Sequence, residues 1–266
     1  MRRATGNGTD LSARFEELAW CETALGAISL RRRREPLLKV DVYEAKLGDE
    51  FLMSSLFTVG EVELAHLGLA KLQGRDLDVV VGGLGLGFTA RTVAEEPRVR
   101  SLVVVEALSE VIGWHERRLL PNSEYLVASP RVRFAHGDFF AMAAAPSGFD
   151  PEAPERRFHA VLVDIDHTPE HVLHSSHAAF YTVEGVSRLA RHLHPGGVFA
   201  LWSDDPPETK FHSVLTEVFA SVQSHVVTFP NHLTGEESAN TVYVAQLPPA
   251  QRATVTSTRW NSLTSE

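Results

Sequence analysis

Acidic and histidine side chains follow an apolar segment in the second half of the chain. Residues 160–163 read Ala-Val-Leu-Val, and Asp164, Asp166 and His167 come just after them. A carboxylate at the end of a buried strand could orient a substrate amine or take its proton. A histidine there could act as a general base near neutral pH. The alternative for either acid is that it caps the following turn. We expect Asp164, Asp166 and His167 at a reacting centre.

The same segment is rich in histidine, which raises the question of a metal site. Spacings of three and four residues could place several of these rings, together with Asp166, on one face of a helix. Pro169, Ser175 and Ser176 argue against one regular helix here. We therefore expect no metal, and surface or substrate-lining roles for the four histidines His167, His171, His174 and His177.

A glycine-rich segment follows the apolar run at 78–81. Gly83, Gly85 and Gly87 let the backbone turn tightly and approach a ligand, and the start of the next helix is electropositive. The segment lacks the Lys-Ser/Thr of a phosphate-binding P-loop. The next apolar run ends at Glu106, where an acid can accept hydrogen bonds from both ribose hydroxyls of a nucleotide. The alternative is a solvated glutamate at a strand end.

A third apolar run ends in His136-Gly137-Asp138-Phe139. Asp138 could accept a hydrogen bond from an adenine amino group, and Phe139 could border the base. A turn-forming aspartate is the alternative for Asp138. Glycines, a glutamate and a Gly-Asp pair at three successive strand ends together predict a nucleotide site.

These residues must be positioned by alternating strands and helices. Continuous apolar strands separated by helices predict a parallel sheet covered on both faces, whose carboxyl ends bind ligands. A last antiparallel pair is expected at 225–229 and 241–245. The other strands are expected at 78–81, 101–105, 131–135, 160–163 and 198–202, and helices at 59–72, 88–96, 109–119, 183–194 (stopped by Pro195-Gly196-Gly197) and 211–222.

A different pattern precedes this sheet. Apolar residues such as Leu11, Phe15 and Leu18 predict a helix over 11–22. Short strands are expected at 27–30, 38–43 and 50–53, and the basic run 31–34 is expected to lie in a solvated strand or turn. The predicted organisation is an N-terminal helix and small β-rich unit over 1–73, a Rossmann-like nucleotide-binding domain over 74–247 and a loose tail over 248–266.

Composition excludes several classes of protein. The 266 residues carry a formal net charge of −9, which is unsuited to tracking phosphate backbones, so nucleic acid is not an expected partner. The single cysteine, Cys21, allows no internal disulfide. We see neither a signal peptide at the start nor an apolar run long enough for a bilayer, so we expect a soluble cytoplasmic protein without a membrane partner.

With these motifs in place, the chain resembles the spermidine synthase branch of the class I S-adenosylmethionine-dependent transferases over roughly residues 24–246. The resemblance rests on the glycine turn with Arg91, on Val105-Glu106, on Gly137-Asp138, on the Asp164 strand end and on residues 194–197 (His-Pro-Gly-Gly). It implies a Rossmann-like sheet of the class I methyltransferase type with an antiparallel last strand. It also implies that Glu106 holds the ribose, that Asp138 holds the adenine amino group, and that Asp164 faces the reacting centre.

The chain departs from the polyamine-making members at three places. They carry an acid inside the glycine turn for the amine of the aminopropyl donor, where this chain has Leu86. They carry Tyr-His-Glu before the sheet, where this chain has Val-Gly-Glu at 59–61. Their two strand-four acids lie three residues apart and precede proline, whereas Asp164 and Asp166 are two apart and precede His167. A polyamine needs several carboxylates to replace its water, so the fold and nucleotide site carry over better than the substrate.

The sequence thus predicts a transferase that uses S-adenosylmethionine, or its decarboxylated form, on a small, amine-bearing metabolite. Methyl transfer is slightly favoured over aminopropyl transfer, the polyamine synthase reaction. A non-catalytic nucleotide-binding regulator is the alternative from another class. An NAD-dependent dehydrogenase fits the glycines and Glu106 but fits Gly137-Asp138 poorly. The exposed edge of a short β unit predicts a homodimer.

Overall fold

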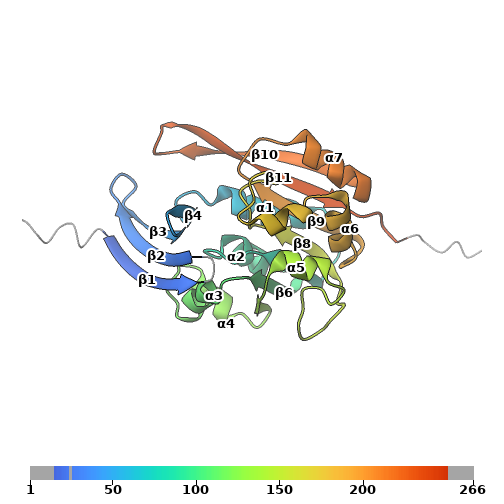
Figure 1. Ribbon diagram of the computed structural model, residues 1–266, viewed down its shortest axis with the longest axis horizontal. Helices are drawn as coiled ribbons and strands as arrows, with labels where there is room; N and C mark the ends of the chain where they lie inside the picture. The colour runs from blue at the N-terminus through green and yellow to red at the C-terminus, as the bar shows by residue number, and fades with distance from the viewer. Residues whose placement is uncertain (1–14, 24–25, 251–266) are drawn as a thin grey trace, which may run out of the picture.

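The computed structural model describes residues 15–23 and 26–250. Two sheets organise this part of the chain. The first is a four-stranded antiparallel sheet in the order β1-β2-β3-β4. Figure 1 shows these strands in blue beside the larger second sheet. Their bounds are Phe15–Thr23 (β1), Gly26–Glu35 (β2), Val40–Leu47 (β3) and Glu50–Ser54 (β4).

The predicted helix over 11–22 is wrong for its described part, because β1 occupies Phe15–Thr23. β1 pairs antiparallel with β2, with an irregularity between Glu17 and Ala19. The partly buried Leu18 and Ala19 pack against the main core. The helical spacing of the apolar residues was compatible with either structure, and pairing with β2 decided between them. Residues 11–14 lie outside the described residues.

The basic run at 31–34 is confirmed as part of a solvated strand, β2. Its arginines alternate between the two faces of the sheet. Arg31 and Arg33 donate to the two carboxylate oxygens of the buried Glu44, at 2.7 and 2.8 Å. Arg32 pairs with Glu16 across β1, and Arg34 pairs with Asp41 across β3. Because each guanidinium has an acidic partner within this sheet, the run is a structural feature of the sheet.

The second sheet has seven strands in the order β10-β11-β9-β8-β5-β6-β7. β5 to β9 run parallel, while β11 is antiparallel to β9 and β10 is antiparallel to β11. The parallel α/β sheet with its antiparallel last pair is therefore confirmed. The strands are β5 (Leu77–Gly82), β6 (Val99–Glu106), β7 (Val132–His136), β8 (Phe158–Val163), β9 (Leu193–Ser203), β10 (Ser221–Asn231) and β11 (Glu236–Gln246).

Helices cover both faces of this sheet, as Figure 1 shows. One apolar cluster joins the face lined by Val79 and Val81 to the first four helices and to the N-terminal sheet. The other joins the face lined by Val80 and Val161 to the last three. The helices are α1 (Val59–Ala70), α2 (Phe88–Glu95), α3 (Ser109–Glu116), α4 (Ser123–Ala128), α5 (Phe139–Ala144), α6 (Val183–Ala190) and α7 (Thr209–Val218), with a short 3-10 helix at Ser175–Ala179.

Several element boundaries differ from expectation. α6 ends at Ala190, and β9 already begins at Leu193, so the segment expected to stop the helix belongs to the strand. α7 ends at Val218 because β10 starts at Ser221 and takes the last residues of the predicted amphipathic helix. α1 packs against α2, β9 and β11, and so covers the second sheet. No helix in the described ranges is long and apolar enough to cross a membrane.

Candidate functional site

The turn between β5 and α2 is held against the end of β8. Gly83, Gly85 and Gly87 all have positive φ, at 91°, 46° and 85°, a region that side chains rarely adopt. A Cβ on Gly83 would lie 2.1 Å from the Asp164 carbonyl oxygen, so no other residue fits there. The three predicted glycines are therefore brought to the carboxyl edge of the sheet, beside the first predicted acid.

Side chains behind the turn hold its carbonyl groups. The Nε2–H of His115 donates to the Gly85 carbonyl (2.9 Å), and the Asn122 amide donates to the Leu86 carbonyl (3.1 Å). His115 is fully buried, which lowers its pKa and keeps the ring neutral, so its Nδ1 accepts from the Ser123 hydroxyl. These residues give the turn a fixed backbone. Sequence reasoning missed them, because no motif marks a side chain that bonds a carbonyl 30 residues away.

Glu106 ends β6 and faces the same turn. Its carboxylate accepts from the Leu84 N–H and the Leu108 N–H, each at 2.9 Å. Burial raises the pKa of Glu106, and the backbone donors oppose that shift. Each carboxylate oxygen has two lone pairs, so both can still accept a hydroxyl proton from a ligand. The structure thus places Glu106 where the sequence predicted it, already oriented by two backbone bonds.

Asp138 and Phe139 follow β7, and the structure separates their roles. Asp138 caps α5 by accepting from the N–H groups of Phe140 and Ala141, so its turn-forming role is observed. Both bonds use the same oxygen, Oδ1. The expectation that Phe139 borders a base is wrong. Phe139 is 2% exposed, and its ring stacks on Phe149 within the core. The ring fits there because Gly82 has no side chain.

Thr89 links the end of β8 to the first turn of α1. Asp164 accepts a hydrogen bond from the Thr89 hydroxyl in the first turn of α2, at 2.8 Å. The same hydroxyl lies 3.2 Å from the carbonyl oxygen of Glu61, in the first turn of α1. Burial raises the pKa of Asp164 to about 6, opposed by the Thr89 bond. Burial and the charge of Asp164 raise the pKa of Glu61 to about 8. The sequence offered one signal for Glu61, its place at the end of the Val-Gly-Glu tripeptide.

Three other buried acids in the described ranges have basic partners. Glu44 lies between two arginines, and Asp78 pairs with Arg100 (2.5 Å) and Arg156 (2.9 Å). Asp150 pairs with Arg133 and Arg156. Among the described residues, no Lys, Arg or His lies within ion-pair distance of Glu61 or Asp164. A buried carboxylate without a counter-charge is costly, and such residues mark functional sites.

Asp166 belongs to a different cluster from Asp164. It is buried and accepts from the Tyr181 hydroxyl, the His177 ring and the Leu173 N–H, each at 2.8 Å. These three donors come from the loop after β8, so Asp166 holds that loop in place. These partners lie 7, 11 and 15 positions further along the chain, so the contacts anchor the loop and are not a cap on the turn that follows Asp166.

His167 lies on the other side of that loop. Its Nε2 is 3.5 Å from the Glu50 carboxylate on β4, and its side chain is 37% exposed. It thus links the loop to the N-terminal sheet. The other histidines of this segment have separate partners: Asp205 for His171, Ser176 for His174 and Asp166 for His177.

The end of β9 closes the site beside α1. A Cβ on Gly60 would lie 2.4 Å from the indole nitrogen of Trp202 and 2.6 Å from the Asn240 amide oxygen. Glycine at this position therefore lets Trp202 lie across the start of α1. The indole N–H is buried and has no hydrogen-bond partner among the described residues. Asp204 accepts from the Asn240 amide at 2.9 Å.

Comparison with known proteins bears on the fold. No family model and no curated protein matches the sequence. Among solved structures, spermidine synthase from Thermotoga maritima aligns over 86% of this chain and 72% of its own, with a TM-score of 0.63 and 15% identity. A probable spermidine synthase from Corynebacterium glutamicum covers 86% and 79%, with a TM-score of 0.58 and 17% identity.

A further spermidine synthase, solved in complex with the transition state analogue AdoDATO, aligns over 86% of this chain and 73% of its own. Its TM-score is 0.65 at 16% identity. The expected resemblance is therefore confirmed for the fold, including both sheets.

A surface hollow lined by Asp138, Phe140 and Arg188 lies along α5 and α6, and neither Glu106 nor Asp164 lines it.

The raised pKa values of Glu61 and Asp164 predict how stability depends on pH. Both groups bind a proton more tightly in the folded chain than in the unfolded one, so the free energy of unfolding falls as pH rises from about 4 to about 8. Glu61→Gln removes one of the two groups whose ionisation causes this loss of stability. We expect this variant to have a higher Tm than the parent near pH 8.5 and a similar Tm near pH 5. Each kcal/mol gained in the free energy of unfolding corresponds to a rise in Tm of ~2–4 °C.

Scanning calorimetry at both pH values measures this difference. The matched control is Glu63→Gln on the same helix, where Glu63 is partly exposed and contacts His66. A Glu61→Gln variant that is less stable than the parent at pH 8.5 would contradict the raised pKa.

Proposed function

We propose that this chain transfers a carbon group from an adenosyl sulfonium compound to the nitrogen of a small amine. One observation carries the proposal. The carboxyl ends of β5, β6 and β8 bring together the glycine turn, Glu106 and Asp164. The turn contacts both acidic residues. The Leu84 N–H donates to the Glu106 carboxylate, and Gly83 packs closely against the Asp164 carbonyl. Ligands of parallel α/β sheets bind at this edge.

The residues present fit an adenosyl nucleotide. Glu106 would accept from the ribose hydroxyls with the lone pairs that its two backbone donors leave free. Asp138 would accept from the adenine amino group through Oδ2, since its helix-capping bonds use Oδ1. The nucleotide supplies a sulfonium centre, whose adjacent carbon is open to attack. The chain's tasks are to align that carbon with the amine, to exclude water and to manage the proton.

Methyl transfer from S-adenosylmethionine is our first candidate reaction. The turn over 82–87 carries no acid, and Leu84 and Leu86 are 3% and 4% exposed, so nothing in it pairs with a purely cationic donor tail. Met53 on β4 lies over Gly85, where a Cβ would be 3.2 Å from its sulfur. Aminopropyl transfer from decarboxylated S-adenosylmethionine is the second candidate, because the fold is shared with spermidine synthases, one of them solved with AdoDATO.

Asp164 would act at the reacting nitrogen. It lies at the end of β8, beside the glycine turn. There it can orient an amine and accept its proton. The Thr89 hydroxyl bond lowers the affinity of this carboxylate for the proton, against the effect of burial. Gly60 packs closely against Trp202 of β9, and it belongs to the tripeptide where the polyamine-making enzymes carry larger residues. The acceptor is therefore expected to be a small amine.

The nucleotide product identifies the reaction. Purified protein is incubated with either sulfonium donor and a panel of small amines, and the products are separated by chromatography with mass detection. We expect S-adenosylhomocysteine if a methyl group moves and methylthioadenosine if an aminopropyl group moves. Nucleotide binding without either product, across the panel, would favour the non-catalytic regulator.

The two acids after β8 should differ in their effect on turnover. Asp164→Asn removes the group that takes the proton, and positioned acid–base groups contribute ~10²–10⁴-fold. We expect a loss of turnover of that order, with nucleotide affinity within about threefold of the parent. Asp166→Asn should lower thermal stability more than turnover, because Asp166 holds the loop through Tyr181 and His177. The reverse ranking would move the catalytic role to Asp166.

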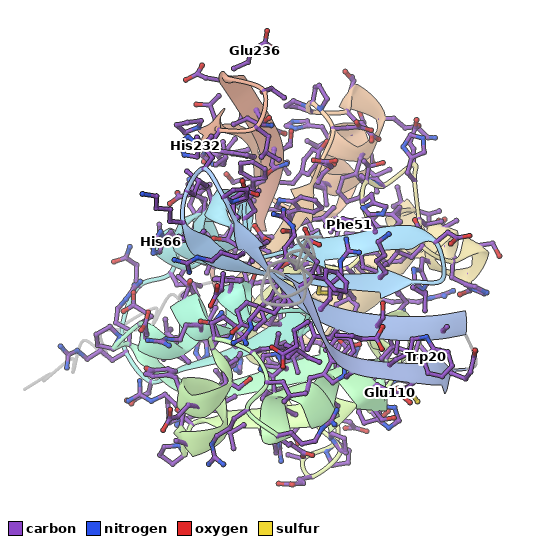
Figure 2. All side chains as sticks on the ribbon, turned by 90° about the vertical axis from the view of Figure 1, so that its left-hand side faces the viewer. Trp20, Phe51, His66, Glu110, His232 and Glu236 are labelled. Carbon is purple, nitrogen blue, oxygen red and sulfur yellow. The ribbon has the colours of Figure 1, made fainter. Side chains whose placement is uncertain are left out.

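We also propose that the protein is a homodimer that pairs through its N-terminal sheet. Phe15, Trp20 and Phe51 on this sheet are 49%, 56% and 44% exposed, so the sheet presents apolar side chains that a partner could cover. Figure 2 labels Trp20 and Phe51 on these strands. β1 is also an edge strand of the sheet, which a second copy would cover. Light scattering should give twice the chain mass, and Trp20→Glu should reduce it. A monomer mass for the parent at micromolar concentration would contradict the dimer.

A further inference from the structure

We propose that His115 is a positioning residue for the nucleotide, which acts through the backbone of Gly85 to set the orientation of Glu106. The ring stands behind the glycine turn, on α3, and has no ligand contact of its own. The proposal rests on the proposed function for the nucleotide at this edge of the sheet, and it holds whichever group is transferred. It adds to the site a residue from an element that no sequence motif marked.

The backbone at 84–85 joins the ring to the acid. The Gly85 carbonyl accepts from the His115 Nε2–H at 2.9 Å. On the other side, the Leu84 N–H donates to the Glu106 carboxylate at 2.9 Å, and the Gly85 N–H opposes the rise in the pKa of that acid. This short stretch of backbone is thus held between two side chains, the acid proposed to bind the ribose and the ring behind the turn.

Within the described ranges, the Gly85 carbonyl has His115 as its only donor. The carbonyl before it accepts from the Gly87 N–H at 2.8 Å, and the carbonyl after it accepts from the Asn122 amide at 3.1 Å. Gly85 has a φ of 46° and no side chain, so its peptide is free to rotate once the bond to His115 is lost. Such a rotation moves the N–H groups that orient Glu106.

Partners on both nitrogens fix the His115 ring. A carbonyl oxygen only accepts, so Nε2 carries the proton and Nδ1 is left as an acceptor. Nδ1 accepts from the Ser123 hydroxyl at 3.2 Å, and the oxygen of that hydroxyl accepts from the Leu120 N–H at 3.3 Å. His115 and Ser123 are both 0% exposed. The donor that meets the turn is therefore held in one orientation by the start of α4.

Gly87 admits the ring to the turn. A Cβ on Gly87 would lie 2.8 Å from His115 Cε1 and 2.8 Å from Leu126 Cδ1, so the bare side of this glycine faces the ring. The bare side of Gly85 faces Met53 instead. We expected both glycines to let a ligand approach. The structure divides them, because Gly87 accommodates the side chain that holds the turn and Gly85 leaves space on the side of β4.

Two amide substitutions separate positioning from packing. A glutamine amide reaches about as far as the Nε2 of a histidine, whereas an asparagine amide is one methylene shorter and reaches only as far as Nδ1. Both side chains are neutral, carry N–H donors and remove the ring, so both lose the packing of His115. They differ in the donor that they offer to the Gly85 carbonyl.

Calorimetric titration of the whole chain with adenosine and with 2′,3′-dideoxyadenosine measures ribose recognition. The parent should prefer adenosine, since only adenosine offers hydroxyl groups to Glu106. We expect His115→Gln to keep that preference within about threefold, and His115→Asn to lower it roughly tenfold. Affinity for dideoxyadenosine should change little in either variant. The matched control is His192→Asn, because His192 is also buried and bonds a carbonyl, that of Ala143 (3.2 Å), away from the turn. It should leave the preference unchanged.

Equal preferences in His115→Gln and His115→Asn would overturn the role of His115 alone, as would an equal loss of affinity for both nucleosides in His115→Asn. If circular dichroism shows that His115→Asn does not fold, Ser123→Ala takes its place. That variant keeps the ring but removes its support, so it should show a smaller loss of the same preference, and an unchanged preference would overturn the proposal. A parent chain that binds neither nucleoside would reject the nucleotide site, and with it both the proposed function and this role.

Discussion

The contact between Gly83 and the end of β8 is the constraint on which the rest of the site depends. A Cβ on Gly83 would lie 2.1 Å from the Asp164 carbonyl oxygen, so the turn after β5 and the acid after β8 share one small space. Packing at this distance requires a glycine with positive φ. It fixes where the backbone N–H groups of the turn lie. It also explains why Glu106, from the next strand, reaches the Leu84 N–H.

Side chains around this contact divide into those that hold it and those that are left free to act. His115 and Asn122 bond carbonyl groups of the turn, and Asp166 uses its three donors to hold the loop after β8. Such satisfied groups stabilise the site and have little capacity left for a ligand. Glu61 and Asp164 have few partners and raised pKa values, which makes them candidates for contact with a ligand.

The sequence predicted the sheet and its edge well, because buried parallel strands leave a direct signature. Continuous apolar runs placed β5, β6 and β8, and the residue after each run identified Gly83, Glu106 and Asp164. It predicted β1 poorly, because Phe15 and Leu18 fit a helical spacing as well as a strand. The prediction for Phe139 was wrong because an aromatic residue beside a candidate site can equally well pack into the core. The space for its ring depends on Gly82, which lies on β5 and far from Phe139 in the sequence.

Residues that act through tertiary contacts left little local signal. His115 bonds a carbonyl 30 positions away, and Glu61 meets Asp164 only because α1 packs against the sheet. The difference between Asp164 and Asp166 was equally hidden. Acids two positions apart would lie on the same face of a continued strand. β8 ends at Val163, so only the packing of the loop shows which acid holds it. Sequence thus locates the edge of the sheet, and the side chains around it decide the chemistry.

The central claim is that this edge holds an adenosyl nucleotide with its sulfur end toward Asp164. A crystal structure of the protein with methylthioadenosine tests it most directly. The account predicts that both ribose hydroxyls lie within hydrogen-bond distance of the Glu106 carboxylate, that the adenine amino group meets Asp138, and that the methylthio group points to Glu61 and Asp164. A nucleoside bound in the hollow along α5 and α6, or one whose ribose makes no contact with Glu106, would contradict it.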